Sequence, residues 1–181
     1  LVRLPFPEYC MTFDSVLINH RLDNVLPGIE RNAEHKYDDG VVHIIAGSKG
    51  LTGAAIMAAK SAWKSGAGAV ILYTTENLLQ VYEKNLPQII KKIVGAPADD
   101  QYKPDHAEQI LSSIRSKPGV VLAGPGMGTD PETIQFLYDV LENYSGPLVL
   151  DADALAGFQK LKELSPEKKR QWILTPHIGE A

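Results

Sequence analysis

The sequence predicts an α/β fold, a doubly wound and mostly parallel sheet with helices on both faces. From Val41 onward, short apolar runs rich in β-branched residues alternate with longer segments of helical periodicity. This alternation is typical of repeated strand–helix units. Several of the apolar runs also end in glycine or in polar residues. In open α/β sheets, ligands bind beyond the carboxyl ends of the strands, so these ends are where a site is expected.

The first half of this pattern contains three expected strands and two expected helices. Val41–Ala46 is a β-branched run that leads into glycine and predicts a buried strand. Thr52–Lys64 predicts a helix with small residues on one face, and a glycine-rich turn separates it from the strand Ala69–Tyr73. The small residues of that face are Ala55, Ala58, Ala59 and Ala62. A helix is expected over Glu76–Glu83 and a strand over Gln88–Val94, although a lysine pair interrupts the latter.

The second half repeats the pattern. We expect a helix over His106–Arg115 and a strand over Val120–Ala123. Asp130 followed by proline predicts an N-cap and the first residue of a further helix. The apolar stripe expected on that helix is Ile134, Leu137, Val140 and Leu141. A strand over Pro147–Leu150, a helix after Asp153 and a strand over Trp172–Leu174 complete the series.

Composition and charge exclude several classes of protein. Of the 181 residues 44% are hydrophobic and 22% are charged, as in a globular domain, and the net charge of -4 offers no basic field for nucleic acid or anionic lipid. The single cysteine, Cys10, excludes an internal disulfide framework and a cysteine-rich zinc site. We expect no nucleic-acid or membrane partner and a cytoplasmic location, or an organelle in a eukaryote. Residues 1–30, with three prolines and no periodicity, are expected to form a linker or lead-in segment before a domain at 31–181.

Two glycine-rich segments follow expected strands. Gly47–Gly53, the first glycine loop, precedes a helix, so its N–H groups could hold a phosphate, but it lacks the Gly-Lys-Ser/Thr ending of a P-loop. A plain strand-to-helix turn that needs glycine explains it equally well. Gly124–Gly128, the second glycine loop, has three glycines in five residues and is favoured as a ligand-facing loop over a plain turn. Its spacing does not match the dinucleotide-binding Gly-x-Gly-x-x-Gly pattern. Met127 within it is expected to pack in the core.

Two further strand ends carry polar groups. Asp151 and Asp153 would share a face if the chain were extended there, although Asp153 could equally cap the next helix. Pro176 favours an extended exit from the last strand, which places His177 at the rim, where a histidine can contact a ligand or transfer a proton. His43 is expected to be a hydrogen-bonded core residue, and His20 and His106 are expected to be solvated.

Taken in order, these motifs resemble the ADP/ATP-dependent NAD(P)H-hydrate dehydratases of the ribokinase-like superfamily. The matching segments are His35–Gly40, Gly47-Ser48 with Thr52–Ala55, Ser65–Gly68, Gly124–Gly128, Asp151–Leu155 and Thr175–Glu180. Each segment is weak evidence alone, but the ordered set is specific, and it covers the chain from residue 31 to its end.

The resemblance implies a lyase of metabolite repair. Members of the family remove water from hydrated NADH or NADPH (NADHX and NADPHX) and use ADP or ATP, for which Mg²⁺ is expected. The implied mechanism phosphorylates the hydroxyl of the hydrate and then eliminates phosphate, because phosphate is the better leaving group. A homo-oligomer is expected, together with a fused or separate epimerase domain that acts on the same hydrate.

The resemblance also assigns site residues. Ala54, Gly126 or Gly128, and His177 match hydrate-binding positions of the family, and Asp151 matches an acidic strand end near the reacting groups. The weaker candidates are Lys36, Tyr37, Gly53, Asp153 and Glu180. No metal ligand is assigned among these residues.

The Gly-x-Gly-Asp motif that supplies the catalytic base of the family does not occur in the 181 residues. The resemblance implies that this base lies beyond Ala181, with Asp151 as an accessory group. We therefore expect an incomplete domain whose carboxyl-terminal part is missing, and a chain that alone is inactive, poorly soluble or unfolded. A degenerate relative is the other explanation. Two alternative functions remain open: a ribokinase-like kinase of a small alcohol or vitamin precursor, and a non-catalytic dinucleotide-binding module.

Overall fold

The computed structural model describes residues 40–156 and 172–179, and every structural statement below refers to them. Six strands form one sheet in the order β3-β2-β1-β4-β5-β6, and each strand is parallel to its neighbours. The strands are β1 (Val41–Ile45), β2 (Ala69–Thr74), β3 (Ile90–Ile93), β4 (Val120–Ala123), β5 (Leu148–Leu150) and β6 (Trp172–Leu174). The predicted doubly wound parallel sheet is confirmed. The lead-in segment predicted at 1–30 lies outside the described residues.

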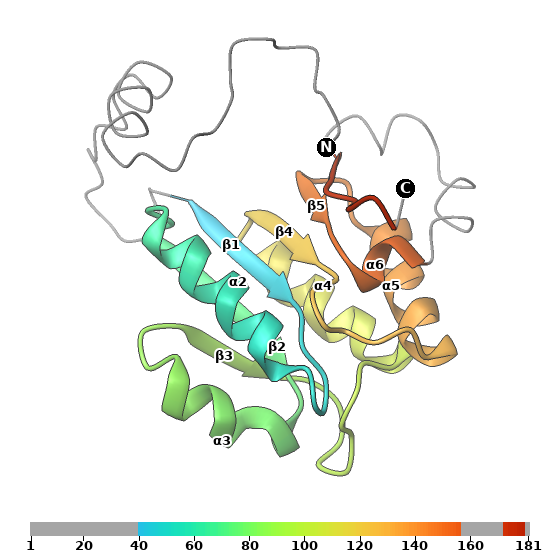
Figure 1. The fold of residues 1–181 in the computed structure, drawn as a ribbon, viewed down its shortest axis with the longest axis horizontal. Helices are drawn as coiled ribbons and strands as arrows, with labels where there is room; N and C mark the ends of the chain where they lie inside the picture. The colour runs from blue at the N-terminus through green and yellow to red at the C-terminus, as the bar shows by residue number, and fades with distance from the viewer. Residues whose placement is uncertain (1–39, 157–171, 180–181) are drawn as a thin grey trace, which may run out of the picture. The chain divides into compact units, whose positions relative to one another are not determined.

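Helices cover both faces of this sheet (Figure 1). The helical elements are α2 (Thr52–Lys64), α3 (Glu76–Asn85), the 3-10 helix η1 (Pro104–His106), α4 (Ala107–Ser116), α5 (Pro131–Asn143) and α6 (Asp153–Ala156). Residues of α2 and α3 pack on one face of the central strands, and residues of α4 and α5 pack on the other. Within the described residues, no helix is both long enough and apolar enough to span a lipid bilayer.

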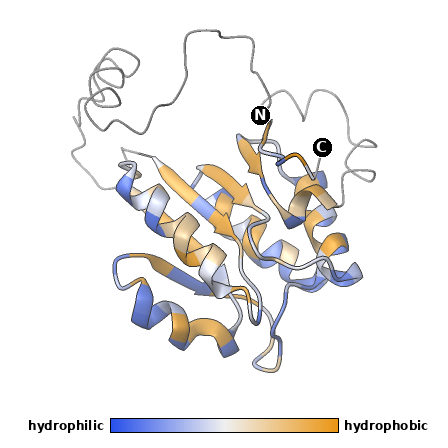
Figure 2. Cartoon of the chain, in the orientation of Figure 1, coloured by the Kyte–Doolittle hydropathy of each residue, from blue (hydrophilic) through white to orange (hydrophobic). Residues whose placement is uncertain are grey.

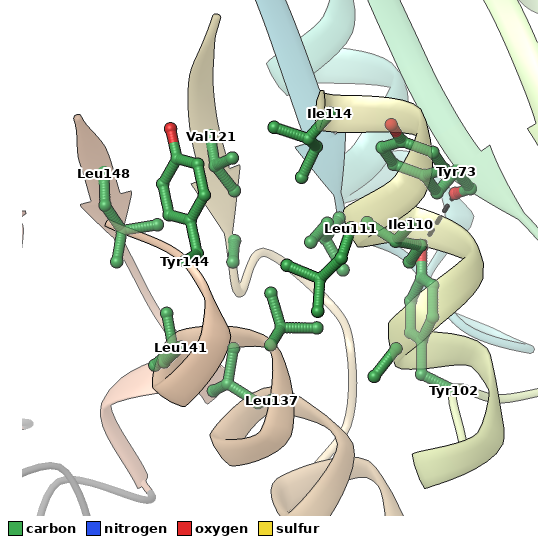
Figure 3. Packing of buried hydrophobic residues seen from close by; sticks show 14 of the residues in the cluster. Tyr73, Tyr102, Ile110, Leu111, Ile114, Val121, Leu137, Leu141, Tyr144 and Leu148 are labelled. Carbon is green, nitrogen blue, oxygen red and sulfur yellow. Dashed lines mark hydrogen bonds between the residues drawn. The ribbon is translucent and has the colours of Figure 1, made fainter. Parts of the chain in front are cut away.

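The core lies on both sides of the central strands, and every residue of β2 is buried. The strands are coloured mainly as hydrophobic in Figure 2, whereas the helices carry hydrophilic outer faces. The larger cluster lies between the sheet and α4 and α5, where Ile110, Leu111, Leu137 and Leu141 pack together (Figure 3). The small-residue face predicted for α2 is confirmed, since Ala55 and Ala59 are completely buried against the other face.

Local signals predicted the start of α5 correctly. The Asp130 carboxylate accepts a hydrogen bond from the Glu132 N–H at 3.0 Å, and Pro131 is the first helical residue. The predicted apolar stripe on this helix needs one correction, because Phe136 is completely buried while Ile134 is half-buried.

His43 is a core residue, as predicted. Its Nε2 lies 2.8 Å from the Lys117 carbonyl oxygen and its Nδ1 lies 2.9 Å from the Tyr73 hydroxyl. Burial lowers the pKa of this imidazole. Both nitrogens are therefore satisfied within the fold, and His43 is not a candidate for catalysis.

The Met127 side chain packs in the core beneath the second glycine loop, as predicted, with 2% of its surface exposed. We expect Met127→Leu to change the free energy of unfolding by no more than about 1.5 kcal/mol, because the two side chains have similar volumes. Denaturant unfolding of the two proteins measures this difference. A large loss of ligand binding at normal stability would contradict the structural role.

Candidate functional site

The sheet has its topological switch point between β1 and β4. From β1 the chain passes through α2 to β2 on one side, whereas from β4 it passes through α5 to β5 on the other. The loops that leave these two strands therefore start at neighbouring carboxyl ends and run in opposite directions. The crevice between two such loops is the usual ligand site of open α/β sheets. These loops contain the two glycine segments that the sequence singles out.

Two hydrogen bonds join the two glycine loops, and a third joins the second loop to β1. The Gly47 N–H donates to the Pro125 carbonyl oxygen at 2.9 Å, and the Ser48 hydroxyl donates to the Gly126 carbonyl oxygen at 3.0 Å. The Gly124 N–H donates to the carbonyl oxygen of Ile45, the last residue of β1, at 3.1 Å. The orientation of each loop consequently depends on the other.

Gly126 brings the second glycine loop against the start of α2. Its φ is +65°, and a Cβ atom at this position would lie 2.8 Å from the Leu51 carbonyl oxygen and 3.0 Å from the Cβ of Ala54. Ala54 and Gly126, two of the predicted binding residues, are thus close neighbours. Within the described residues, no side chain caps α2 and its first turn has no acidic residue. The positive end of this helix therefore faces the region where the two loops meet.

The Asp-Ala-Asp segment after β5 extends the site along the same edge. The Asp153 carboxylate accepts a hydrogen bond from the Gly128 N–H at 2.9 Å, and the Thr175 hydroxyl donates to the Asp151 carboxylate at 2.8 Å. Ala152 between them has a φ of +49°, which is unusual for a residue other than glycine. The extended conformation in which both aspartates would share a face is therefore wrong. Asp153 begins α6 and also holds the second glycine loop.

His177 lies farther along the carboxyl edge of the sheet. It follows β6, which is separated from β4 by β5, and it is exposed. Its Nδ1 accepts a hydrogen bond from the Gly179 N–H at 2.9 Å. The structure thus brings Ala54 and Gly126 together, and it places His177 on the same edge beyond β5.

Part of the predicted site falls on residues outside the described ranges. Three weaker candidates, Lys36, Tyr37 and Glu180, lie there, and so does Ala181, beyond which the resemblance places the catalytic base. Neither the roles of these three residues nor the position of the base is tested by the structure. Each of them therefore stays a prediction.

Sequence reasoning missed a buried charged cluster in the segment after β3. The Asp99 carboxylate lies 2.6 Å from the Lys103 Nζ, 2.7 Å from the Ala96 N–H nitrogen and 3.1 Å from the His106 Nε2. His106 is completely buried, so the expectation that it is solvated is wrong. An acidic residue seven positions before the histidine, with a lysine between them and a proline next to that lysine, is the signal that could have found it. The neighbouring Asp100 pairs with Lys49 of the first glycine loop at 3.3 Å, which links the cluster to the site.

From the contacts of Asp99 we expect the folded protein to lose stability in acid. The hydrogen bond from Lys103, followed by that from the Ala96 N–H, lowers the pKa of Asp99 to about 2. Its stabilising contribution is therefore complete above the unfolded-state pKa of about 3.9 and is lost as the pH falls through the folded-state value. We expect Asp99→Asn to cost about 1–3 kcal/mol at pH 7, because the amide is uncharged and replaces one of the two acceptor oxygens with an NH₂ donor, and to cost less near pH 2. Urea unfolding at both pH values measures the difference, and an equal cost at both would contradict this account.

A metal centre is not evident in the described part of the chain. Residues 40–156 and 172–179 contain no group of three or more His, Cys, Asp or Glu side chains that could hold a metal ion.

Comparison with known proteins places the chain in a family. The family model described as NAD(P)H-hydrate dehydratase matches residues 42–181. A bifunctional NAD(P)H-hydrate repair enzyme of Salinibacter ruber is 37% identical over 149 residues, which cover 81% of this chain and 27% of that enzyme. The ADP-dependent (S)-NAD(P)H-hydrate dehydratase of Bacillus subtilis is 31% identical over 83% of this chain and 49% of its own length. The chain therefore spans about half or less of these relatives.

Solved structures agree with this placement. The ADP/ATP-dependent NAD(P)H-hydrate dehydratase from Bacillus subtilis, co-crystallised with ATP and Mg²⁺, is similar with a TM-score of 0.61 and 31% identity, over 83% of this chain and 49% of that one. A ribokinase-like superfamily protein from Enterococcus faecalis, at 24% identity, has a TM-score of 0.67 over 82% of this chain and 49% of its own, and it supports the fold alone. On the ordered motifs, the sheet topology and the matched residues together, the chain belongs to the NAD(P)H-hydrate dehydratase family.

Proposed function

We propose that this chain carries the hydrate-binding part of an enzyme that dehydrates NADHX and NADPHX and uses ADP or ATP. The observation that carries the proposal is the junction of the two glycine loops at the switch point, within a chain of this family. Glycines at a strand-to-helix turn let a ligand approach the backbone closely, and exposed N–H groups at a helix start favour phosphate. A hydrated dinucleotide carries phosphates that can bind at a helix start, and its extended shape can follow the carboxyl edge of the sheet.

We further propose roles for the individual residues. Ala54 and Gly126, with Gly128 beside them, would line the hydrate site, and His177 would contact the hydrate farther along the edge. Asp151 is an accessory candidate. The Thr175 hydroxyl donates to one oxygen of its carboxylate, and we propose that the other oxygen interacts with the reacting groups. Gly53 and Asp153 are weaker candidates, the latter because its carboxylate already binds the Gly128 N–H.

The proposed chemistry has two stages. The hydroxyl of the hydrate receives the terminal phosphoryl group of the nucleotide, and phosphate then leaves as the nicotinamide ring is restored. Alignment and stabilisation of charge supply most of the acceleration in phosphoryl transfer. The base that accepts the proton of the hydroxyl is proposed to follow Ala181 in the complete protein. Mg²⁺ usually binds nucleotide phosphates with few protein ligands, so its site need not be a cluster of carboxylates, and no step here depends on one.

We also propose a homo-oligomer and an epimerase that acts on the same hydrate, fused or separate. The name of the relative from Salinibacter ruber describes a bifunctional repair enzyme, which supports a fused partner activity.

The test is recovery of the NADH absorbance from NADHX, with ADP or ATP, by the 181-residue chain and by the product of the complete gene. We expect recovery by the gene product with at least one nucleotide. No recovery with either nucleotide would contradict the proposal. Phosphorylation of a small alcohol with NADHX untouched would favour the kinase alternative, and binding of NADPHX without turnover would favour the non-catalytic module.

A further inference from the structure

Two buried tyrosines from opposite faces of the sheet reach the point where β1 ends. Tyr102 is 2% exposed and belongs to the cluster beneath α4 and α5, whereas Tyr82 is completely buried in the cluster beneath α2 and α3. Both approach the backbone of Ala46 and Gly47, which begins the first glycine loop. They differ in what their hydroxyl groups bind.

The Tyr102 hydroxyl is bonded to two strand ends. Its single proton is shared between two carbonyl oxygens in a three-centre hydrogen bond, that of Tyr73 on β2 at 2.7 Å (Figure 3) and that of Ala46 just after β1 at 3.1 Å. Its ring stacks on Phe136 of α5 with centroids 5.0 Å apart. The Tyr102 carbonyl oxygen accepts a hydrogen bond from the Thr133 hydroxyl at 3.0 Å. This one residue therefore connects β1, β2 and α5 beneath the site.

The hydrogen bond to the Ala46 carbonyl oxygen restrains the peptide group between Ala46 and Gly47. The Ala46 carbonyl and the Gly47 N–H belong to the same planar unit, so fixing one end of it fixes the other. The carbonyl end meets the Tyr102 hydroxyl, and the N–H end donates to Pro125 of the second glycine loop at 2.9 Å. Gly47 then turns the chain with a φ of +81°. A rotation of this peptide would therefore break the Gly47–Pro125 hydrogen bond between the two loops.

Tyr82 provides the contrast. Within the described residues its hydroxyl has no hydrogen-bond partner, and burial raises its pKa to about 12. A Cβ atom on Gly47 would lie 2.3 Å from that hydroxyl oxygen, so Tyr82 packs directly against the loop without binding it.

We propose that Tyr102 is a positioning residue for the hydrate site, which it serves by fixing the Ala46–Gly47 peptide and, through it, the junction of the two glycine loops. This inference rests on the function proposed above. Tyr102 touches neither substrate nor nucleotide in this account. Its effect passes through the peptide to Gly47, Pro125 and Gly126.

The experiment compares Tyr102→Phe with the matched control Tyr82→Phe in the product of the complete gene. Each variant keeps its ring and loses only a buried hydroxyl. For Tyr102→Phe we expect hydrogen exchange in residues 46–51 to become about three- to tenfold faster, because the loss of one hydrogen bond changes an equilibrium by about this factor. We expect the KM for NADPHX to rise by a similar factor, while kcat stays within about twofold. Tyr82→Phe should leave exchange and KM unchanged and the melting temperature equal or higher, because an unpaired buried hydroxyl is removed.

Three results would overturn the proposal. The first is a uniform increase of exchange across the sheet with a lower melting temperature, which indicates a structural role alone. The second is an equal effect of the two variants. The third is faster exchange in residues 46–51 with an unchanged KM. If the unmodified protein does not dehydrate NADPHX, the proposed function fails, and the exchange measurement still decides whether Tyr102 holds the loop.

Discussion

Gly124→Ala is expected to destabilise the protein by at least about 4 kcal/mol, a large part of the stability of a typical domain. The φ of Gly124 is +127°, and a Cβ atom there would lie 1.7 Å from the Asp151 carbonyl oxygen and 2.8 Å from the Cβ of Ala154. The nearest obstacle is backbone that joins β5 to α6, so a side-chain rotation cannot relieve the clash. The Gly124 N–H is also bonded to Ile45, which prevents the loop from moving away.

Gly128→Ala is the matched control for this prediction. Gly128 has a φ of +84°, and the nearest atom to an added Cβ is the Ser48 hydroxyl oxygen at 3.8 Å. Its substitution should therefore cost only the backbone strain of a left-handed alanine, about 1–2 kcal/mol. Denaturant unfolding of both variants separates steric exclusion from strain. Losses that agree within about 1 kcal/mol would show that the close approach of Gly124 to Asp151 does not matter.

Elements with strong local signals were predictable from the sequence. The bounds of α2 follow from its alanine face and the glycines that flank it, and the start of α5 follows from its aspartate and proline. The lysine pair of β3 weakened the prediction of a strand over Gln88–Val94, but the strand is present. β3 is an edge strand of the sheet that the described residues form, where charged side chains are tolerated, and Lys91 pairs with Glu83 of α3 at 3.2 Å.

The parts of the site that depend on contacts between distant residues could not be predicted. The motifs indicated that both glycine loops lie at strand ends, but the bond between Gly47 and Pro125 spans the switch point and has no local signal. Tyr102 was missed because its partners, Ala46 and Tyr73, lie far from it in sequence. His106 was wrongly expected in solvent because nothing in its immediate sequence shows that the segment after β3 folds over it.

Gly126 is a poor position at which to probe the hydrate site. Gly126→Val is expected to weaken hydrate binding, but a side chain there would also meet the Leu51 carbonyl oxygen and strain the backbone. Lost binding would then be hard to separate from a displaced loop. Gly53 is a cleaner position, because it is exposed, lies in the first turn of α2, and has no atom within 4 Å of an added Cβ.

Gly53→Glu is expected to raise the KM for NADPHX about tenfold or more without destabilising the fold. An acidic residue in the first turn interacts favourably with the helix dipole, and replacing glycine in a helix contributes up to about 1 kcal/mol. If the phosphates of the hydrate bind at the start of α2, the new carboxylate repels them from that position. Thermal unfolding should therefore shift upward or stay constant while binding weakens.

Gly53→Gln adds nearly the same bulk without the charge, so the difference between the two variants reports electrostatics alone. We expect the glutamine variant to raise KM by less than about threefold, and the difference between the variants to shrink as salt is added, because exposed charges are screened. Calorimetric titration of NADPHX into both variants, at low and high ionic strength, makes the comparison. Equal affinities for the two variants would show that the phosphates bind elsewhere, and the first glycine loop would then be a turn that needs glycine only for its backbone conformation.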